Sequence, residues 1–386
     1  MSPPELKSFL TKYYAYAFCY DLIFAYPVYA ILFRSHGLSL LQVSFLMIWW
    51  SVCAGAFEVP SGALADTFSR RKLLTVAPLI KSLCFVLWHL ADGSFFLYAA
   101  GFTMWSFGSS LVSGTQEAIL YDSLTAANRL NEYEKARGRQ RQCHRAACTI
   151  ACMAGGMIAQ YEIGLALRLS VLPPLIGAAT AWSMVEPPRS GAAHDTRYCT
   201  HFKNAWRDIK SNPVLRYTFI YVLLGIGLLA ESEEYNGLYW ESVGTPLCAV
   251  GFLFALEGVV EVLGFSFGDR LKNYRRLDHI VPFLVGLLML GVGAFPSRAM
   301  IPAMLLCYAL VAPMEVVIDG RMQRCMSGES RATTTSFVGL FCTVVGLPLS
   351  LLFGYLSKTH GLGAGYMFFG VVMLAFSVWV ARRSSS

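Results

Sequence analysis

The chain alternates between long apolar blocks and short polar segments. Each block is about 20 residues long, the length that a helix needs to cross roughly 30 Å of hydrocarbon. The apolar runs are continuous, whereas strands of a membrane β-barrel alternate apolar and polar residues over about ten positions. We therefore predict an all-α integral membrane protein with twelve transmembrane helices, near residues 13–33, 41–64, 73–91, 95–124, 140–161, 165–184, 213–231, 246–267, 277–297, 299–321, 332–357 and 361–381.

The composition supports this prediction and excludes several classes of protein. Of the 386 residues, 55% are hydrophobic and 14% are charged, and the mean hydropathy is +0.51. Because soluble domains carry about 25% charged residues, a soluble enzyme and a disordered regulator are excluded. The 11 cysteines are scattered, mostly inside predicted spans. That distribution indicates reduced, buried thiols rather than a secreted disulfide scaffold.

The positive charge follows the predicted topology. The net charge is +7, and most of the 31 Lys and Arg residues lie in the N-terminal segment, the even-numbered loops and the C-terminal tail. This asymmetry obeys the positive-inside rule, which predicts cytoplasmic termini and leaves no excess of charge that calls for a nucleic-acid partner. No small-residue cleavage site follows the first apolar run, so we predict an uncleaved transmembrane helix there.

The longest polar interruption divides the predicted spans six and six. We therefore predict an N-terminal six-helix bundle at residues 1–184, a cytoplasmic central loop at 185–212 and a C-terminal six-helix bundle at 213–386. Within the loop, Phe202, Trp206 and Ile209 recur at helical spacing between basic residues. This pattern is typical of a short amphipathic helix on the membrane surface, and a plain linker is the alternative.

The two halves repeat the same acidic positions. Glu58 and Asp66, at the end of the second span, recur as Glu261 and Asp269, each 203 residues later (261 minus 58, and 269 minus 66). A second echo pairs Glu117 and Asp122 with Glu315 and Asp319. Both echoes lie at equivalent helix ends, which indicates an internal duplication. Repeated halves with a site between them are the usual plan of secondary transporters.

The loop after the second span carries a family resemblance. Residues 62–73 resemble the signature of the major facilitator superfamily, which reads Gly, three residues, Asp, a basic residue, any residue, Gly, Arg, then Arg or Lys. The matching residues are Gly62, Asp66, Arg70 and Arg71. The segment departs at Thr67, where a basic residue is usual, and at Ser69, where Gly is usual. Residues 58–62 and 113–124 are similar to a bacterial branch of the family.

The resemblance implies a fold, a mechanism and a location. It implies two pseudo-symmetric six-helix bundles that rock around a central site, in a bacterial inner membrane. It also implies a latch that holds the cytoplasmic side closed, formed by Gly62, Asp66, Arg70, Arg71, Asp122 and, in the second half, Asp269. Ordinary topogenic charge is the alternative interpretation of the basic residues among them.

Six acids lie away from the extreme ends of the predicted spans: Asp21, Glu58, Glu117, Glu257, Glu261 and Glu315. An acid at the centre of a membrane helix costs on the order of 2.5–3.5 kcal/mol. We therefore expect these side chains to face the interior or a wet cavity, where such residues carry protons or substrate charge.

Asp21 lies near the middle of the first span, with Phe18 and Phe24 on roughly the same helical face. A carboxylate among aromatic rings suits a cation, so we predict a role in proton coupling and substrate binding. The alternative is that Asp21 pairs with Lys81, which itself has three further interpretations: snorkelling, neutralising Glu58 or binding substrate directly.

The fourth span presents a polar stripe. Ser110, Ser113 and Glu117 follow one another at spacings of three and four residues, so they share a helical face. We predict that this face, together with Glu58, Glu257 and Glu315, lines a substrate cavity. Small hydroxyl residues also serve ordinary helix packing.

The fifth span offers two further patterns. His144, Cys148 and Cys152 share a face and could bind a transition metal, although a small-residue packing surface explains the cysteines equally well, and we predict no metal. Residues 154–156 (Ala-Gly-Gly) weakly resemble the superfamily's antiporter motif without its proline.

These observations predict a monomeric, proton-coupled antiporter that exports a small organic compound, cationic or zwitterionic because acids outnumber bases inside the spans. Its partners are the lipid bilayer, the substrate and protons, and no cofactor is expected. A proton symporter that imports a nutrient or chelate is one alternative, and a receptor that binds without transport is another. An enzyme is disfavoured, because no nucleophile–base set or phosphate-binding loop is present.

Overall fold

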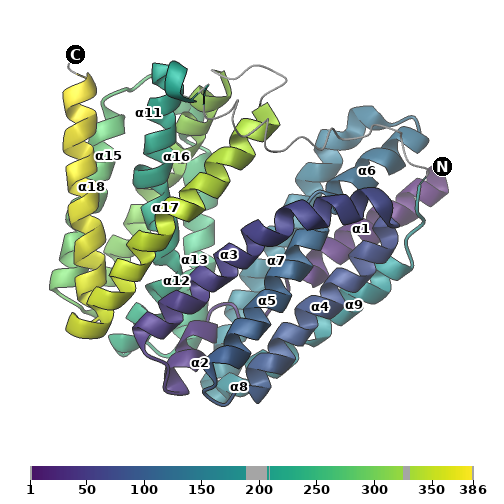
Figure 1. Ribbon diagram of the computed structural model, residues 1–386, viewed down its shortest axis with the longest axis horizontal. Helices are drawn as coiled ribbons and strands as arrows, with labels where there is room; N and C mark the ends of the chain where they lie inside the picture. The colour runs from purple at the N-terminus through teal and green to yellow at the C-terminus, as the bar shows by residue number, and fades with distance from the viewer. Residues whose placement is uncertain (1, 188–206, 208, 325–330, 385–386) are drawn as a thin grey trace. The chain divides into compact units, whose positions relative to one another are not determined.

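The computed structural model describes residues 2–187, 207, 209–324 and 331–384 (Figure 1). Side chains are described over the same ranges except at 59, 63, 66, 134, 269, 323, 331–345 and 384. The described residues are helices joined by short turns, without a β-strand. The predicted all-helical membrane fold is therefore confirmed.

The internal contacts divide the chain into two units. Unit 1 comprises residues 1–38, 45–194 and 246–255, and unit 2 comprises 39–44, 195–245 and 256–386. The helices that lie mainly in unit 1 are α1 (Pro3–Tyr20), α2 (Tyr29–Ser35), α3 (Leu40–Thr67), α4 (Arg70–Leu90), α5 (Phe95–Val112), α6 (Thr115–Ala126), α7 (Tyr133–Tyr161), α8 (Ile163–Leu169) and α9 (Leu172–Trp182).

Unit 2 contains the remaining helices. They are α11 (Pro213–Tyr221), the π-helical segment η2 (Val222–Ile226), α12 (Gly227–Ser242), α14 (Gly268–Leu271), α15 (Leu277–Ala294), α16 (Ile301–Arg324), α17 (Arg331–His360) and α18 (Leu362–Ser384). Helix α13 (Leu247–Phe265) contributes its first half to unit 1 and its second half to unit 2.

Nine helical segments in the described residues are long and apolar enough to cross a membrane: 40–58, 70–90, 95–126, 163–182, 213–242, 247–265, 277–294, 298–322 and 362–383. The other three predicted spans correspond to α1, α7 and α17. The first two carry basic residues in their N-terminal parts, and the side chains of residues 331–345 in α17 lie outside the description. Twelve spans therefore remain a prediction.

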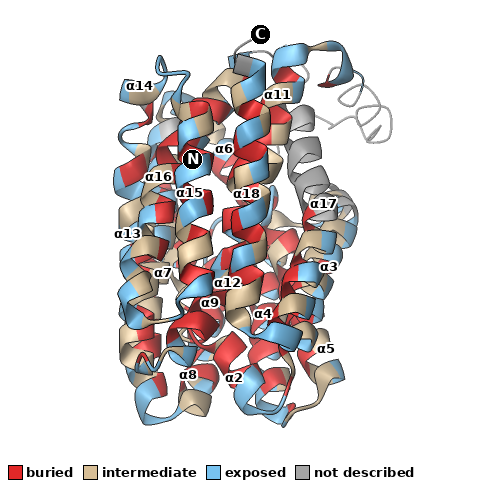
Figure 2. Cartoon of the chain, turned by 90° about the vertical axis from the view of Figure 1, so that its left-hand side faces the viewer, coloured by how far each residue is buried: buried red, intermediate tan, exposed pale blue. Residues whose placement is uncertain are grey.

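Helices within each unit pack through small residues, as membrane helices do. In unit 1, α4 packs against α5 and α9, while α1 packs against α7 and α9. In unit 2, α15 packs along α18, where a side chain at Gly370 would meet the Gly286 carbonyl at 2.8 Å. Buried and exposed residues alternate along both helices (Figure 2). Large apolar side chains such as Leu83 and Val371 are exposed, as a lipid-facing surface requires.

Three predicted spans are not single helices. The first stops at Tyr20 and resumes at Tyr29, and the interruption contains Pro27, which lacks a backbone N–H. The fourth breaks where Gly114 has a φ of +71°, a conformation that L-residues seldom adopt. The sixth divides into α8 and α9 just before Pro173. Hydropathy predicts the position of these three spans, but it does not predict whether the backbone is helical throughout.

The central loop falls largely outside the described residues. The predicted amphipathic helix cannot be followed through Phe202 and Trp206, which belong to the undescribed part. Ile209 is buried and packs with Leu215, Phe219 and Met322 of unit 2. The proposed boundaries at 184/185 and 212/213 stay predictions.

Candidate functional site

A buried charged cluster forms where α1 ends. Asp21 is the C-cap residue of α1, and the chain then runs through a non-helical segment to α2. Ser170 holds this segment by accepting a hydrogen bond from the backbone N–H of Ala25 at 2.9 Å. The carboxyl end of a helix carries partial negative charge, so a carboxylate at that point requires cationic partners.

Lys81 of α4 supplies one of these partners. Its Nζ lies 2.9 Å from Asp21 Oδ1 and donates to the Tyr20 carbonyl at 3.2 Å. The ammonium also lies 4.1 Å from the centre of the Tyr20 ring and 5.1 Å from that of Trp105, within the range of a cation–π attraction. The lysine is 1% exposed, so this charge is held by its partners and not by water.

His144 of α7 supplies the second partner. Its Nδ1 lies 2.8 Å from Asp21 Oδ2, while Tyr26 Oη donates to Asp21 Oδ1 at 2.9 Å. A carboxylate only accepts, so Nδ1 carries the hydrogen and Nε2 is left to bind a second proton. The side chain of His144 is 46% exposed, compared with 14% for Asp21. The cluster therefore has one accessible edge, formed by the His144 ring.

These contacts correct part of the expectation for Asp21. The carboxylate pairs with Lys81, which was the alternative interpretation. Phe24 does not share a helical face with it, because α1 ends at Tyr20 and Phe24 lies in the non-helical segment, whereas Phe18 lies in the last turn of α1. The aromatic rings beside the charges are those of Tyr20, Tyr26 and Trp105.

The fifth-span motifs now have structural roles. His144 Nε2 lies 4.0 Å from Cys148 Sγ, but Nδ1 is committed to Asp21. Over the described residues, no group of three metal-ligating side chains is brought together. Gly155 touches the backbone of Phe24 in the non-helical segment, where any side chain would collide with the carbonyl. The small residues of α7 thus allow the chain to pass close to Asp21.

Four other predicted cavity residues lie on the surfaces of their units. Glu58, Ser113, Glu117 and Glu315 are exposed, whereas Ser110 is buried. Ser113 Oγ lies 3.5 Å from Glu58 Oε1, and Glu117 pairs with Arg137 of α7. They do not join the Asp21 cluster.

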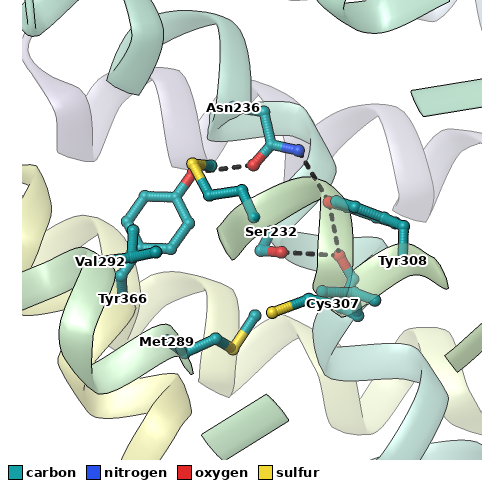
Figure 3. A pocket seen from close by; sticks show the side chains of 9 residues that line it. Ser232, Asn236, Met289, Val292, Cys307, Tyr308 and Tyr366 are labelled. Carbon is teal, nitrogen blue, oxygen red and sulfur yellow. Dashed lines mark hydrogen bonds between the residues drawn. The ribbon is translucent and has the colours of Figure 1, made fainter. Parts of the chain in front are cut away.

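A second buried carboxyl, Glu257 of α13, lies in unit 2 and is 2% exposed. Asn236 Nδ2 of α12 donates to Glu257 Oε2 at 3.1 Å and to Tyr308 Oη at 2.7 Å. Tyr366 Oη donates to Asn236 Oδ1 at 2.9 Å, completing a row of polar groups beside a small cavity (Figure 3). The space in which the centre of a water molecule fits is about 10 Å³. The cavity can therefore hold about one water molecule.

Asn236 was missed because the seventh span was predicted to end at residue 231. The helix continues to Ser242 through the acidic stretch at 231–234. The signal was available in the sequence, since Tyr235, Leu238 and Tyr239 recur at helical spacing and are buried. The three glutamates at 231–234 lower the local hydropathy, so a prediction from hydropathy ends the helix too early.

The predicted latch is described in part. Arg70, at the start of α4, pairs with Asp122 of α6 and donates to the Ala118 carbonyl at 3.0 Å. Arg71 instead stacks over Trp182, and Gly62 lies within α3. Two further predicted members, Asp66 and Asp269, have side chains outside the description.

Glu186 is an unpredicted partner of the same region. Its Oε1 accepts from the Arg70 backbone N–H at 2.7 Å, and its Oε2 accepts from Ser69 Oγ. Glu186 therefore supplies the negative charge that the amino end of α4 favours. It lies 116 residues from Arg70, and no local pattern points to it.

Comparison with known proteins gives a consistent assignment. The sequence matches the family described as Major Facilitator Superfamily over residues 14–346. It is 25% identical over 359 residues to the lysophospholipid transporter LplT of Cronobacter sakazakii (strain ATCC BAA-894), and the match covers 84% of this chain and 86% of that protein.

Solved structures share the fold. The nucleoside transporter NupG matches with a TM-score of 0.78 and 10% identity over 100% of both chains. A bacterial homologue of the human lysosomal transporter Spinster, in an inward-facing and occupied conformation, matches with a TM-score of 0.73 and 15% identity. That match covers 100% of this chain and 96% of the other. At these identities the likeness establishes the fold alone.

Proposed function

Because the chain belongs to the Major Facilitator Superfamily and is a membrane transporter of that family, we propose that it works as a proton-coupled antiporter. In this proposal, it exports a small organic compound by alternating access, and protons flowing inward drive the export. Each elementary charge that moves down 100 mV supplies about 2.3 kcal/mol.

We propose further that the substrate is a zwitterionic amphiphile whose headgroup binds at the Asp21 cluster. The observation that carries this proposal is the balance of charge there: Asp21 faces Lys81 at 2.9 Å and His144 at 2.8 Å. A headgroup with both signs can exchange with this pair, its anion meeting the two bases and its cation meeting Asp21. A purely cationic substrate would leave Lys81 buried without a counter-ion, which is costly.

The relative's name is consistent with that chemistry. A lysophospholipid carries a phosphate, often an ammonium group, and a single acyl chain, and the relative is called a lysophospholipid transporter. Lysophosphatidylethanolamine is therefore the first probe, because it carries both charges on a short headgroup.

The proposal is tested by flux in inverted membrane vesicles that are made acidic inside. An exporter should accumulate the lysolipid in these vesicles, whereas a proton symporter for import should not. Binding without flux would identify the receptor alternative and contradict the proposal.

The role of the cluster is tested in the same vesicles with Asp21→Asn. We expect this variant to lose at least about tenfold in lysolipid affinity, since the ammonium loses a charge-assisted contact of about 1.5–3 kcal/mol. Asp92→Asn is the matched control, because Asp92 is an exposed turn residue of the same unit with a φ of +39° that Asn tolerates. Equal affinity in both variants would remove Asp21 from the binding site.

A further inference from the structure

One buried acid has no part in the proposed substrate site. Glu257 is buried within unit 2, and the neutral amide of Asn236 donates a hydrogen bond to its Oε2 at 3.1 Å. The other carboxyl oxygen, Oε1, is buried without a hydrogen-bond partner among the described residues. An unpaired buried carboxylate is costly, and a bound proton removes that cost.

The surroundings of Glu257 differ from those of the other buried acids. Asp21, Asp122 and Asp278 each pair with a basic side chain, and within the described part of the chain Glu257 has no such pair. The charged groups that act on Glu257 are themselves acids, Glu233 of α12 and Glu261 of α13.

The remaining titratable groups around it are neutral. They are the tyrosine hydroxyls of Tyr308 on α16 and Tyr366 on α18, and the thiol of Cys307 on the cavity wall. Among the described residues no basic side chain pairs with this carboxylate, so a proton from outside the protein can neutralise it.

We propose that Glu257 binds the proton whose movement is coupled to transport. The proton adds to Oε1 and converts the carboxylate to a neutral carboxylic acid, while Oε2 keeps the hydrogen bond from Asn236. The inference rests on the proposed transport function and deepens it. It assigns the coupling ion to unit 2 and leaves Asp21, already neutralised by Lys81, to the substrate.

The geometry favours a proton over larger cations. The neighbouring cavity has room for about one water molecule, which excludes an organic ammonium ion. A sodium ion requires several oxygen ligands, and Asn236 instead directs its N–H group toward Glu257. The water-sized cavity is lined by Tyr308 and by Asn236, the residue that donates to Glu257 (Figure 3).

A substrate-free measurement tests the site directly. In infrared difference spectra of the purified protein taken across a pH titration, we expect the carbonyl band of a protonated, buried carboxylic acid. Glu257→Gln should abolish this band. Glu241→Gln, at the exposed end of α12, should leave it intact. A band that persists in Glu257→Gln overturns the assignment, whatever the substrate is.

A transport measurement tests the coupling. A pH step of one unit can drive about tenfold accumulation per coupled proton. In proteoliposomes, Glu257→Gln should lose this accumulation, because Gln can neither take up nor release a proton. The proposal is overturned if Glu257→Gln still accumulates lysolipid in response to the pH step. It is overturned equally if only Glu231→Gln loses this accumulation, or if a sodium gradient at constant pH drives accumulation by the wild-type protein. If the wild-type protein does not move the lysolipid at all, the proposed substrate fails while the infrared test of Glu257 still stands.

Discussion

Lys81 shows how a full charge is accommodated inside a membrane helix. An ammonium has three N–H donors, and three acceptors surround this one: Asp21 Oδ1 at 2.9 Å, the Tyr20 carbonyl at 3.2 Å and Tyr26 Oη at 3.4 Å. The lysine thus satisfies the carboxyl end of α1 and the Asp21 side chain together.

Replacing Lys81 by Met tests this account at the residue scale. Met keeps the length and apolar character of the stem but removes the charge, which leaves Asp21 buried opposite His144 alone. We expect a loss of about 3–5 kcal/mol in the free energy of unfolding, the usual cost of breaking a buried ion pair from one side. The measurement is the unfolding midpoint of the purified protein in detergent.

The double variant provides the control. Adding Asp21→Asn to Lys81→Met removes the stranded charge, so the unfolding midpoint should rise again toward the wild-type value. A double variant as unstable as the single one would mean that packing, and not charge, sets the stability of this cluster.

The sequence indicated which residues of this cluster are unusual and offered the Asp21–Lys81 pair as one alternative, but it did not point to the contact with His144. A charge inside an apolar block is visible from composition, so Asp21, Lys81 and Glu257 could be selected. Pairing depends on which helices meet, and His144 lies 123 residues from Asp21. The same limit applies to Glu186 and Arg70, because only tertiary structure brings them together.

At the scale of elements, the break in the first span depends on close packing by α7. A Cβ at Gly155 would collide with the carbonyl oxygen of Phe24, and a backbone atom cannot rotate away as a side chain can. Gly155 is therefore required by the path of the chain around Asp21.

Substituting Gly155 by Ala should destabilise the protein by about 1–3 kcal/mol, the usual cost of overpacking. It should also weaken lysolipid binding, because the segment that presents Asp21 must shift. Gly138 lies on the same helix, and a Cβ there meets nothing within 4 Å. Gly138→Ala should therefore be neutral, or stabilising by up to about 1 kcal/mol. The measurement is the thermal unfolding midpoint of both variants. Equal shifts of the midpoint in Gly155→Ala and Gly138→Ala would refute the packing argument.

The sequence also did not predict where the helices are irregular. The first span breaks at Asp21, and the repeat offset of 203 maps this residue to Leu224, inside the π-helical segment Val222–Ile226. Both halves therefore depart from α-helical geometry at matching positions. The first break contains a proline, Pro27, as a local signal, but nothing in the five residues of the second distinguishes a π-helix from an α-helix.

At the scale of the whole molecule, each unit holds an ion pair near the ends of equivalent helices, with the charges exchanged, in addition to the Asp21–Lys81 pair of unit 1. In unit 1 the base, Arg70, begins α4 and the acid, Asp122, lies near the end of α6. In unit 2 the acid, Asp278, begins α15 and the base, Arg321, lies near the end of α16. The basic side chain is 15% exposed in both pairs, so the two are buried alike.

The two orders are not equivalent toward the helix dipoles. An acid at an amino end and a base at a carboxyl end are favourable, which is the arrangement in unit 2. Unit 1 has the reverse order, and there Glu186 provides the anion at the amino end of α4. The two units thus hold similar buried ion pairs, but the charges are favourably placed toward the helix dipoles in unit 2, whereas unit 1 needs Glu186 as an additional anion.

Exchanging the unit 2 pair tests whether charge or shape maintains it. Asp278→Arg or Arg321→Asp alone places like charges together and should cost about 3–5 kcal/mol of stability, as breaking a buried pair does. The double exchange restores an ion pair but opposes both dipoles and loses the hydrogen bond from Tyr217 Oη at 3.0 Å. It should therefore recover most of the loss and remain about 1–3 kcal/mol below the wild-type protein. Unfolding midpoints of the three variants measure this order. If the double exchange is no more stable than the singles, the pair depends on its particular side-chain shapes, and the two units are not interchangeable in charge.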